Sequence, residues 1–196
     1  MDHAAHVRRH FEDAIALKQR MVGTLAPAIA RAGEALAVAL GRGAKVLACG
    51  NGGSAADCQH FAAELVGRFE RERPGLPAIA LTVDTSALTA IANDYAFDQV
   101  FAKQVEALGR EGDVLLALST SGNSANVIAA MKAASSRGMA LIALTGRDGG
   151  AMAAMLGPRD HHLNVAHPRT MRVQEVHILA LHCLCDTVDN ILHGEK

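Results

Sequence analysis

Hydrophobic positions follow two different periods along the chain. Over residues 2–22 and 25–41 apolar side chains recur every three or four positions, as Phe11, Ile15 and Ile29 illustrate, which predicts two helices. From residue 45 onward the pattern changes to short, continuous apolar runs that end in loops rich in glycine or serine. These runs predict buried strands at 45–50, 77–82, 113–119, 139–146 and 161–166.

Helical stretches separate the predicted strands. They are expected at 54–68, 86–91, 98–108 and 125–137, briefly after 146–150, and over 169–192. Continuously apolar strands that alternate with helices are typical of a parallel sheet covered on both faces. The sequence therefore predicts an α/β fold, a three-layer αβα sandwich with a five-stranded parallel sheet and extra N-terminal helices. We expect one domain over residues 1–196, in which the helices of residues 1–42 serve oligomer packing.

Composition narrows the class of protein. The net charge is −1 and no cluster of Lys and Arg stands out, which argues against a nucleic-acid partner. No apolar run approaches the ~20 residues of a membrane helix, and the N-terminus lacks the apolar core of a signal peptide. We therefore expect a cytoplasmic protein without a membrane partner. The four cysteines, which form no disulfide framework and no metal-binding pair, are expected to be reduced core residues: Cys49, Cys58, Cys183 and Cys185.

The small size of the apolar side chains indicates close helix packing. Aromatic residues make up only 3% of the chain, so the core must be built from Ala, Leu, Val, Ile and Met. The last predicted helix carries apolar residues on nearly every face. A helix of that kind is buried, and here we expect a second subunit to cover it.

A cluster of hydroxyl side chains follows the third predicted strand. Ser119, Thr120, Ser121 and Ser124 surround Gly122 and open a helix. Hydroxyls and the unpaired N–H groups of a helix N-terminus can bind a phosphate without Lys or Arg. Ordinary N-capping is the alternative, but it needs only one hydroxyl. The loop lacks the pattern of a nucleotide P-loop.

A glycine loop follows the first predicted strand, and its helix carries a polar stripe. Gly50-Asn51-Gly52-Gly53-Ser54 permits close approach of a ligand to the backbone, although a tight turn alone would also explain it. In the helix that follows, His60 and Glu64 stand four residues apart and could share a metal ion or a substrate. A solvated polar face is the alternative.

Polar side chains also interrupt the last, apolar helix. They are Gln174, Glu175, His177 and His182, and each needs a partner if the helix is buried. A lone histidine in such a place is most often a core residue with one hydrogen bond. Helical spacing alone would pair Glu175 with His182, because Gln174 and His182 lie about 12 Å apart along the axis. The residues themselves leave this choice open.

Four segments, in this order, resemble the signature segments of the bacterial phosphoheptose isomerases, which have the sugar isomerase (SIS) fold. They are GNGGSAADCQHFAAELVGR at 50–68, LTAIANDYAF at 88–97, LALSTSGNSANV at 116–127 and RVQEVHILALHCLCD at 172–186. The similarity extends over essentially the whole chain. It implies an enzyme that converts D-sedoheptulose 7-phosphate to D-glycero-D-manno-heptose 7-phosphate, a precursor of lipopolysaccharide heptose. It also implies a homotetramer with active sites between subunits.

The resemblance assigns roles to individual residues. It implies one Zn²⁺ per subunit bound by His60, Glu64, Gln174 and His182, and an acid–base pair of Glu64 and His182. It further implies that Glu64 and Gln174 also contact the substrate. The other substrate-binding residues that it implies are Asn51, Gly52, Gly53, Asn93, Asp94, Ser119, Thr120, Ser121 and Ser124. The family's choice of Gln174 disagrees with the spacing argument for Glu175.

Non-catalytic proteins of the same fold give two rival interpretations. The segments FERERPGLPAIAL and LGREGDVLLALST also resemble the DnaA initiator-associating protein, a tetrameric regulator of replication. Such regulators lack the intact Glu/His pair, whereas Glu64 and His182 are both present here. A sugar-phosphate-sensing regulator would add a DNA-binding module, for which the chain has no spare length. The sequence therefore favours the enzyme.

Overall fold

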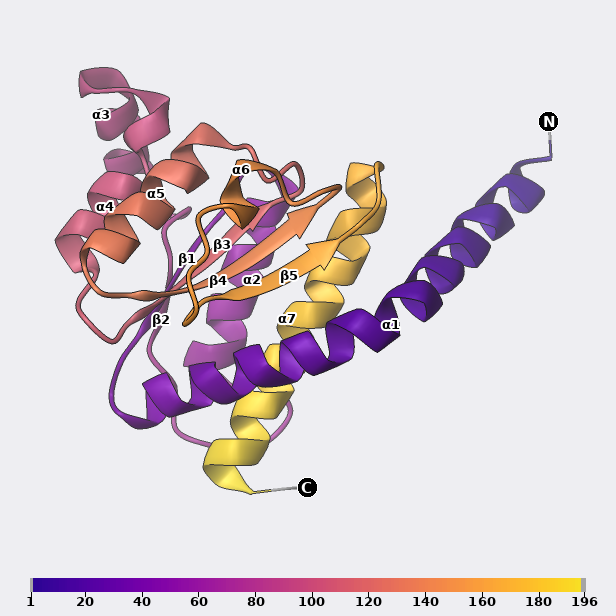
Figure 1. The fold of residues 1–196 in the computed structure, drawn as a ribbon, viewed down its shortest axis with the longest axis horizontal. Coiled ribbons are helices and arrows are strands. Elements are labelled where there is room, and N and C mark those ends of the chain that lie inside the picture. The colour runs from indigo at the N-terminus through magenta and orange to yellow at the C-terminus, as the bar shows by residue number, and fades with distance from the viewer. Residues whose placement is uncertain (1, 195–196) are drawn as a thin grey trace.

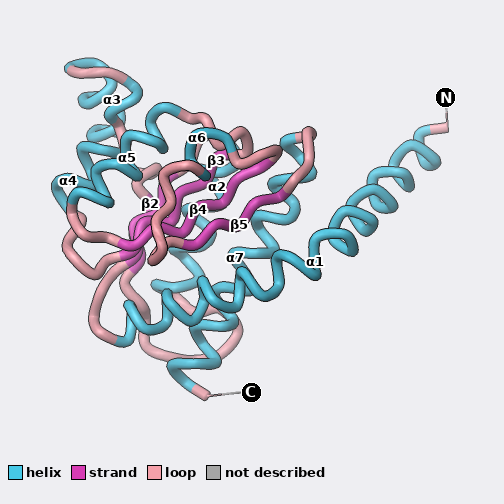
Figure 2. Tube along the Cα trace, in the orientation of Figure 1, coloured by secondary structure: helices cyan, strands magenta, loops and turns pink. Residues whose placement is uncertain are grey.

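A five-stranded parallel sheet lies between two layers of helices in the computed structural model, which describes residues 2–194 (Figures 1 and 2). The strand order is β2-β1-β3-β4-β5. The strands are β1 (Val46–Cys49), β2 (Ala78–Ala80), β3 (Val114–Ser119), β4 (Ala140–Gly146) and β5 (His161–Val165). The helices are α1 (His3–Gly41), α2 (Gly53–Val66), α3 (Thr85–Asp94), α4 (Ala102–Leu108), α5 (Ala125–Ser136), α6 (Gly150–Ala153) and α7 (Thr170–His193), with a 3₁₀ turn at Phe97–Gln99. The predicted fold class is thus confirmed.

Successive side chains along each strand point to opposite faces of the sheet, and each face forms its own hydrophobic core. Val46 and Ala48 of β1 face the core shared with α1, α2 and α7, whereas Leu47 and Cys49 face the core shared with α4 and α5. Both sets are fully buried, as expected of a parallel sheet with helices on both faces. The carboxyl ends of β1 and β3, which pair directly, lie at the same edge and carry the glycine and hydroxyl loops.

The prediction of two N-terminal helices is wrong, because α1 is one continuous helix of 39 residues. The predicted break lay at residues 23–24, shortly before Pro27. Pro27 lacks an N–H and so leaves the carbonyl of Gly23 without its helical partner, but both residues are exposed and water can take that place. The predicted helix at 98–108 differs as well, since a 3₁₀ turn at Phe97–Gln99 precedes α4.

The apolar packing of the first helix on the domain begins at Leu17 and continues through its C-terminal part. Leu25, Ile29 and Leu36 belong to the core with α7, while the N-terminal part of α1 projects beyond the rest of the molecule (Figure 1). Phe11 and Ile15 are more than half exposed there. By length and composition α1 is also apolar enough to cross a membrane, a property that core helices of globular proteins share. Its packing against α7 and β5 accounts for the buried apolar residues of its second half, such as Leu25, Ile29 and Leu36.

Three of the four cysteines are fully buried, and all four are free thiols. Burial raises the pKa of Cys49 and of Cys185 to about 12. Thiols with such pKa values stay protonated near neutral pH and are poor nucleophiles. The expectation of reduced core cysteines agrees with this environment.

His177 of α7 makes the stability of the fold depend on pH. It is buried and its Nε2 lies 3.0 Å from the carbonyl oxygen of Thr145. Burial lowers the pKa of His177 from 6.5 to about 4, against the opposing effect of that hydrogen bond. The folded chain therefore binds fewer protons than the unfolded chain between these two values.

We expect the free energy of unfolding to fall by up to about 3 kcal/mol as the pH is lowered from 6.5 to 4. His161 and His162, whose pKa values are also lowered by burial, act in the same direction. Urea unfolding at pH 7 and pH 4.5 measures the effect. His177→Gln, whose amide can still donate to Thr145, should reduce the loss, and an equal loss in that variant would contradict this origin.

Candidate functional site

The glycine loop brings the start of α2 against the start of α7. Gly52 adopts a φ of 58°, a conformation that glycine accepts without strain, and α2 begins at the next residue. A Cβ atom at Gly53 would lie 2.7 Å from Nε2 of Gln174. The absence of a side chain at Gly53 therefore permits close contact between this loop and the amide of Gln174.

The hydroxyl loop forms a compact cluster at the N-terminus of α5. The Oγ of Ser119 lies 2.8 Å from the Oγ of Ser124 and 3.3 Å from that of Ser121. Ser124 occupies the N-cap position but makes no capping hydrogen bond. A Cβ at Gly122 would lie only 2.0 Å from the carbonyl oxygen of Gly149, so only glycine fits there. Capping does not explain these hydroxyls, and their number and position suit an oxyanion such as phosphate.

Helices α2 and α7 bring together His60, Glu64 and His182. Nε2 of His60 lies 2.8 Å from Nε2 of His182 and 3.2 Å from Oε1 of Glu64. The side chain of His60 is 44% exposed and that of Glu64 22%, so a ligand can reach both. The ring of Phe69 packs beside His182 at 5.7 Å between centroids. A carboxylate and two imidazoles in one accessible cluster can move protons.

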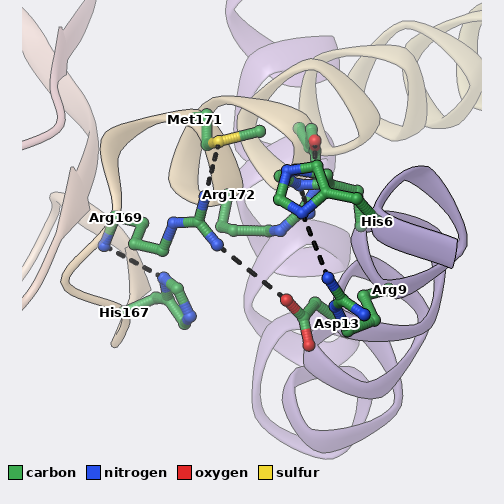
Figure 3. A network of polar contacts seen from close by, with 9 residues as sticks. His6, Arg9, Asp13, His167, Arg169, Met171 and Arg172 are labelled. Atoms are coloured by element: carbon green, nitrogen blue, oxygen red, sulfur yellow. Dashed lines mark hydrogen bonds and ion pairs between the residues drawn. The ribbon is translucent and has the colours of Figure 1, made fainter. Parts of the chain in front are cut away.

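The start of α7 separates the roles of Gln174 and Glu175. Gln174 contacts the glycine loop, whereas Glu175 lies 2.5 and 2.6 Å from Nη1 of the buried Arg172. The same arginine contacts His10 of α1 at 2.8 Å. Figure 3 shows this junction, in which Arg169 also reaches Asp13 of α1 at 3.9 Å. The pairing of Glu175 with His182 that helical spacing favoured is therefore wrong, because Arg172 holds Glu175.

Asn93 and Asp94, at the end of α3, are exposed. The side-chain amide of Asn93 donates to Asp94 at 2.8 Å. Helix α3 has no buried residue and lies at the far side of the molecule from α1 (Figure 1). A groove of about 180 Å³ lined by Asn51, Gly52 and Leu88 connects α3 with the glycine loop. The structure thus places α3 beside the loop without bringing Asn93 or Asp94 into contact with it.

The residues of α2 and α7 that the resemblance assigns meet at two separate points along these helices. Gly53 lies next to Gln174 where both helices begin, and His60 contacts His182 further along them. Seven residues along α2 correspond to about 10 Å, and Glu64 lies a further turn away. One chain therefore brings together three of the four expected zinc ligands, His60, Glu64 and His182, and leaves Gln174 at the start of α7.

The side chains of His60, Glu64 and His182 are of the types that bind a zinc ion. Two imidazole nitrogens and one carboxylate oxygen are the protein ligands of many catalytic zinc sites. Across residues 2–194, however, no three His, Cys, Asp or Glu side chains are already arranged around a metal position. His60 and His182 instead contact each other directly. The chemistry of the donors fits zinc, and their side chains would have to adjust to bind it.

Sequence reasoning missed two residues that support these groups. Arg73 is buried beside α2 and donates to the carbonyl oxygen of Glu64 at 2.8 Å. Asn126 of α5 contacts the side chain of Asn51 in the glycine loop. Asn51 and Asn126 are 75 positions apart, and no local pattern signals their contact. Arg73 is the last of four consecutive charged residues at 70–73, so the local sequence does not single it out.

Comparisons with known proteins identify the family of this chain. The model of the SIS domain family matches residues 9–146. The chain is 56% identical over 194 residues to a phosphoheptose isomerase from Halorhodospira halophila, an alignment that covers 99% of this chain and 98% of that protein.

Solved structures show the same likeness. The phosphoheptose isomerase structure from Neisseria gonorrhoeae matches with a TM-score of 0.91 and 57% identity, covering 95% of this chain and 98% of that one. The structure from Francisella tularensis matches with a TM-score of 0.94 and 46% identity, covering 97% and 100%. The chain therefore belongs to the SIS domain family and, within it, to the phosphoheptose isomerases.

Proposed function

We propose that this chain is an aldose–ketose isomerase that converts D-sedoheptulose 7-phosphate to D-glycero-D-manno-heptose 7-phosphate in the cytoplasm. The observation that carries the proposal is the accessible cluster of His60, Glu64 and His182 in a chain that also carries a hydroxyl loop not used for capping. Its likeness to phosphoheptose isomerases over nearly the whole length supports the same reaction. The product would be a precursor of lipopolysaccharide heptose.

The reaction moves a proton between two adjacent carbons. A base removes the proton from the carbon that bears a hydroxyl group, an acid protonates the carbonyl oxygen, and an enediol(ate) forms. A proton then returns to the former carbonyl carbon while the original hydroxyl group loses its proton and becomes the new carbonyl, which completes the exchange. Glu64 and His182 would supply the base and the acid, and His60, within 3.2 Å of both, would hold them in place.

Phosphate binding would fix the other end of the substrate. Ser119, Thr120, Ser121 and Ser124, with the N–H groups at the start of α5, would hold the dianion. Asn51, Gly52 and Gly53, together with Asn93, Asp94 and Gln174, would contact the sugar. Holding both ends keeps the reacting carbons at the catalytic groups.

A zinc ion would be bound by His60, Glu64 and His182, with Gln174 as the fourth ligand that the family resemblance implies. When bound, zinc polarises a carbonyl oxygen and stabilises negative charge on it. The donor types of the three clustered residues support this assignment.

The active protein would be a homotetramer with sites between subunits. An apolar groove of about 300 Å³ runs between α1 and α7, lined by Val22, Leu179 and Cys183 among others. Val22 and Leu179 are exposed in the single chain at 60% and 42%. A further copy would cover these side chains, and it would also bring the phosphate loop of one chain to the Glu64 cluster of another.

The direct test is incubation of the purified protein with D-sedoheptulose 7-phosphate, with and without a chelator. Formation of the aldose supports the isomerase, and its loss on chelation, with recovery on adding Zn²⁺, supports the metal. No aldose under any metal condition would contradict the proposed activity. Binding to the replication initiator in the absence of isomerisation would favour the regulatory alternative.

Mixed oligomers test the sharing of sites between subunits. We expect Glu64→Gln and the double variant Ser121→Ala/Ser124→Ala each to be inactive alone. If the two groups of one site come from different chains, random mixing restores about a quarter of the sites. Coexpression with two affinity tags and assay of the doubly tagged oligomer measures this. No recovery in oligomers shown to be mixed would place both groups on one chain.

A further inference from the structure

We infer that Asn126 is a positioning residue, which fixes the amide of Asn51 and holds the sugar-binding loop in register with the phosphate-binding loop. This inference rests on the proposed function, in which Asn51 contacts the sugar. It concerns a residue that lies next to the hydroxyl loop without belonging to it.

The two asparagines form a reciprocal pair. Nδ2 of Asn51 donates to Oδ1 of Asn126 at 2.8 Å, and Nδ2 of Asn126 donates to Oδ1 of Asn51, also at 2.8 Å. Asn126 is only 3% exposed, whereas Asn51 is partly exposed. The buried member is thus held on the protein side, and the other member faces the space where a ligand can bind.

A third hydrogen bond fixes the orientation of both amides. The N–H of Val127 donates to Oδ1 of Asn126 at 2.9 Å, so this atom must be the oxygen. Asn51 must then direct one N–H towards Asn126 and accept with its own oxygen. One N–H and one lone pair of the Asn51 amide remain for a hydroxyl group of the sugar.

The pair also joins two loops that would otherwise be independent. Asn51 follows β1, and Asn126 lies in the first turn of α5, two residues after Ser124. β1 and β3 are neighbours in the sheet, but their loops extend beyond the last paired residues. Two partly buried hydrogen bonds between side chains 75 positions apart therefore set the position of the sugar loop relative to the phosphate loop.

A double-mutant cycle tests the inference. We expect Asn126→Ala and Asn51→Ala each to lower kcat/KM for D-sedoheptulose 7-phosphate by about tenfold. Because Asn126 acts through Asn51, the double variant should be no more than about twofold worse than Asn51→Ala. Inorganic phosphate, as a competitive inhibitor, should bind Asn126→Ala within about twofold of wild type, since the hydroxyl loop is intact.

Val127→Ala serves as the control for a merely structural effect. Val127 is buried in the same helical turn and binds the amide pair through its backbone N–H, which alanine keeps. This variant should lower the melting temperature while kcat and KM stay near their wild-type values.

Two results would overturn the inference. One is additive losses in the double variant, and the other is a weakening of phosphate inhibition equal to the loss in kcat/KM. If the wild-type protein is active and either result is obtained, only the role of Asn126 is overturned. A wild type that does not isomerise the substrate overturns the proposed function itself.

Discussion

Replacing Glu64 by glutamine should lower kcat by about 10²–10⁴-fold and leave the fold intact. The amide has the same shape but cannot accept a proton from carbon, and general acid–base catalysis contributes a factor of this size. Glu64 is partly exposed and contacts His60 at 3.2 Å, so no buried ion pair is lost. Initial rates with D-sedoheptulose 7-phosphate, together with the melting temperature of the same sample, measure both expectations.

Glu106→Gln is the matched control for this substitution. Glu106 is an exposed residue of α4, on the opposite side of the sheet, whose carboxylate lies 3.8 Å from Lys103. It should keep its activity and its melting temperature. Near-normal activity of Glu64→Gln would remove Glu64 from the mechanism, whereas loss of activity in both variants would point to a general effect of charge.

Replacing Arg73 by alanine should lower the free energy of unfolding by about 3–5 kcal/mol. Nε of Arg73 lies 2.8 Å from Oδ1 of Asp189, and both side chains are almost completely buried. The guanidinium also donates to the carbonyl oxygens of Glu64 and Leu65 at the end of α2. Without Arg73 these acceptors and a buried carboxylate lose their partner. Urea unfolding at one fixed protein concentration measures the change.

Two comparisons isolate the buried pair. Arg68→Ala removes an exposed pair with Glu72 and should change stability by less than about 1 kcal/mol. The double variant Arg73→Met/Asp189→Leu, in which neither charge remains, should be more stable than Arg73→Ala. A loss below about 1 kcal/mol in Arg73→Ala would show that the pair contributes little to the fold.

Arg73 also connects stability with the proposed catalysis. It holds the backbone of Glu64 on α2 and, through Asp189, the helix that carries His182 two turns earlier. Both helices are therefore fixed at one end by the same guanidinium. Variants of Arg73 that still fold should lose activity as the spacing between Glu64 and His182 becomes less well defined.

The sequence predicts most of this architecture and part of the site. Continuous apolar runs identify β1, β3 and β4, because these strands are buried on both faces. The edge strands β2 and β5 are partly exposed, and β5 includes His161, His162 and Asn164. The break expected near Pro27 was wrong, since an exposed proline can be accommodated when water replaces the lost hydrogen bond. The choice between Gln174 and Glu175 depended on Arg172, which stands three residues before Glu175 on α7 and binds its carboxylate. The spacing argument for Glu175 and His182 left this nearer partner out.

Other contacts depend on tertiary structure alone. Arg73 and Asp189 are 116 residues apart, and Asn51 and Asn126 are 75 apart. No periodicity marks such pairs, because helical or strand spacing relates only residues within one segment. The assembly of four chains and the zinc ion stay predictions for the same reason, since both depend on groups outside one chain.

The uncharged side chains of the hydroxyl loop bear on how fast the phosphorylated product can leave and on how KM depends on salt. The loop presents neutral donors at the N-terminus of α5 and no lysine or arginine between Ser119 and Ser124. Under the proposed function, a phosphate dianion held by this loop forms no ion pair with the loop itself, so no such contact has to break before the product departs. Raising the ionic strength should consequently change KM only slightly, in contrast to enzymes that hold phosphate with cationic side chains.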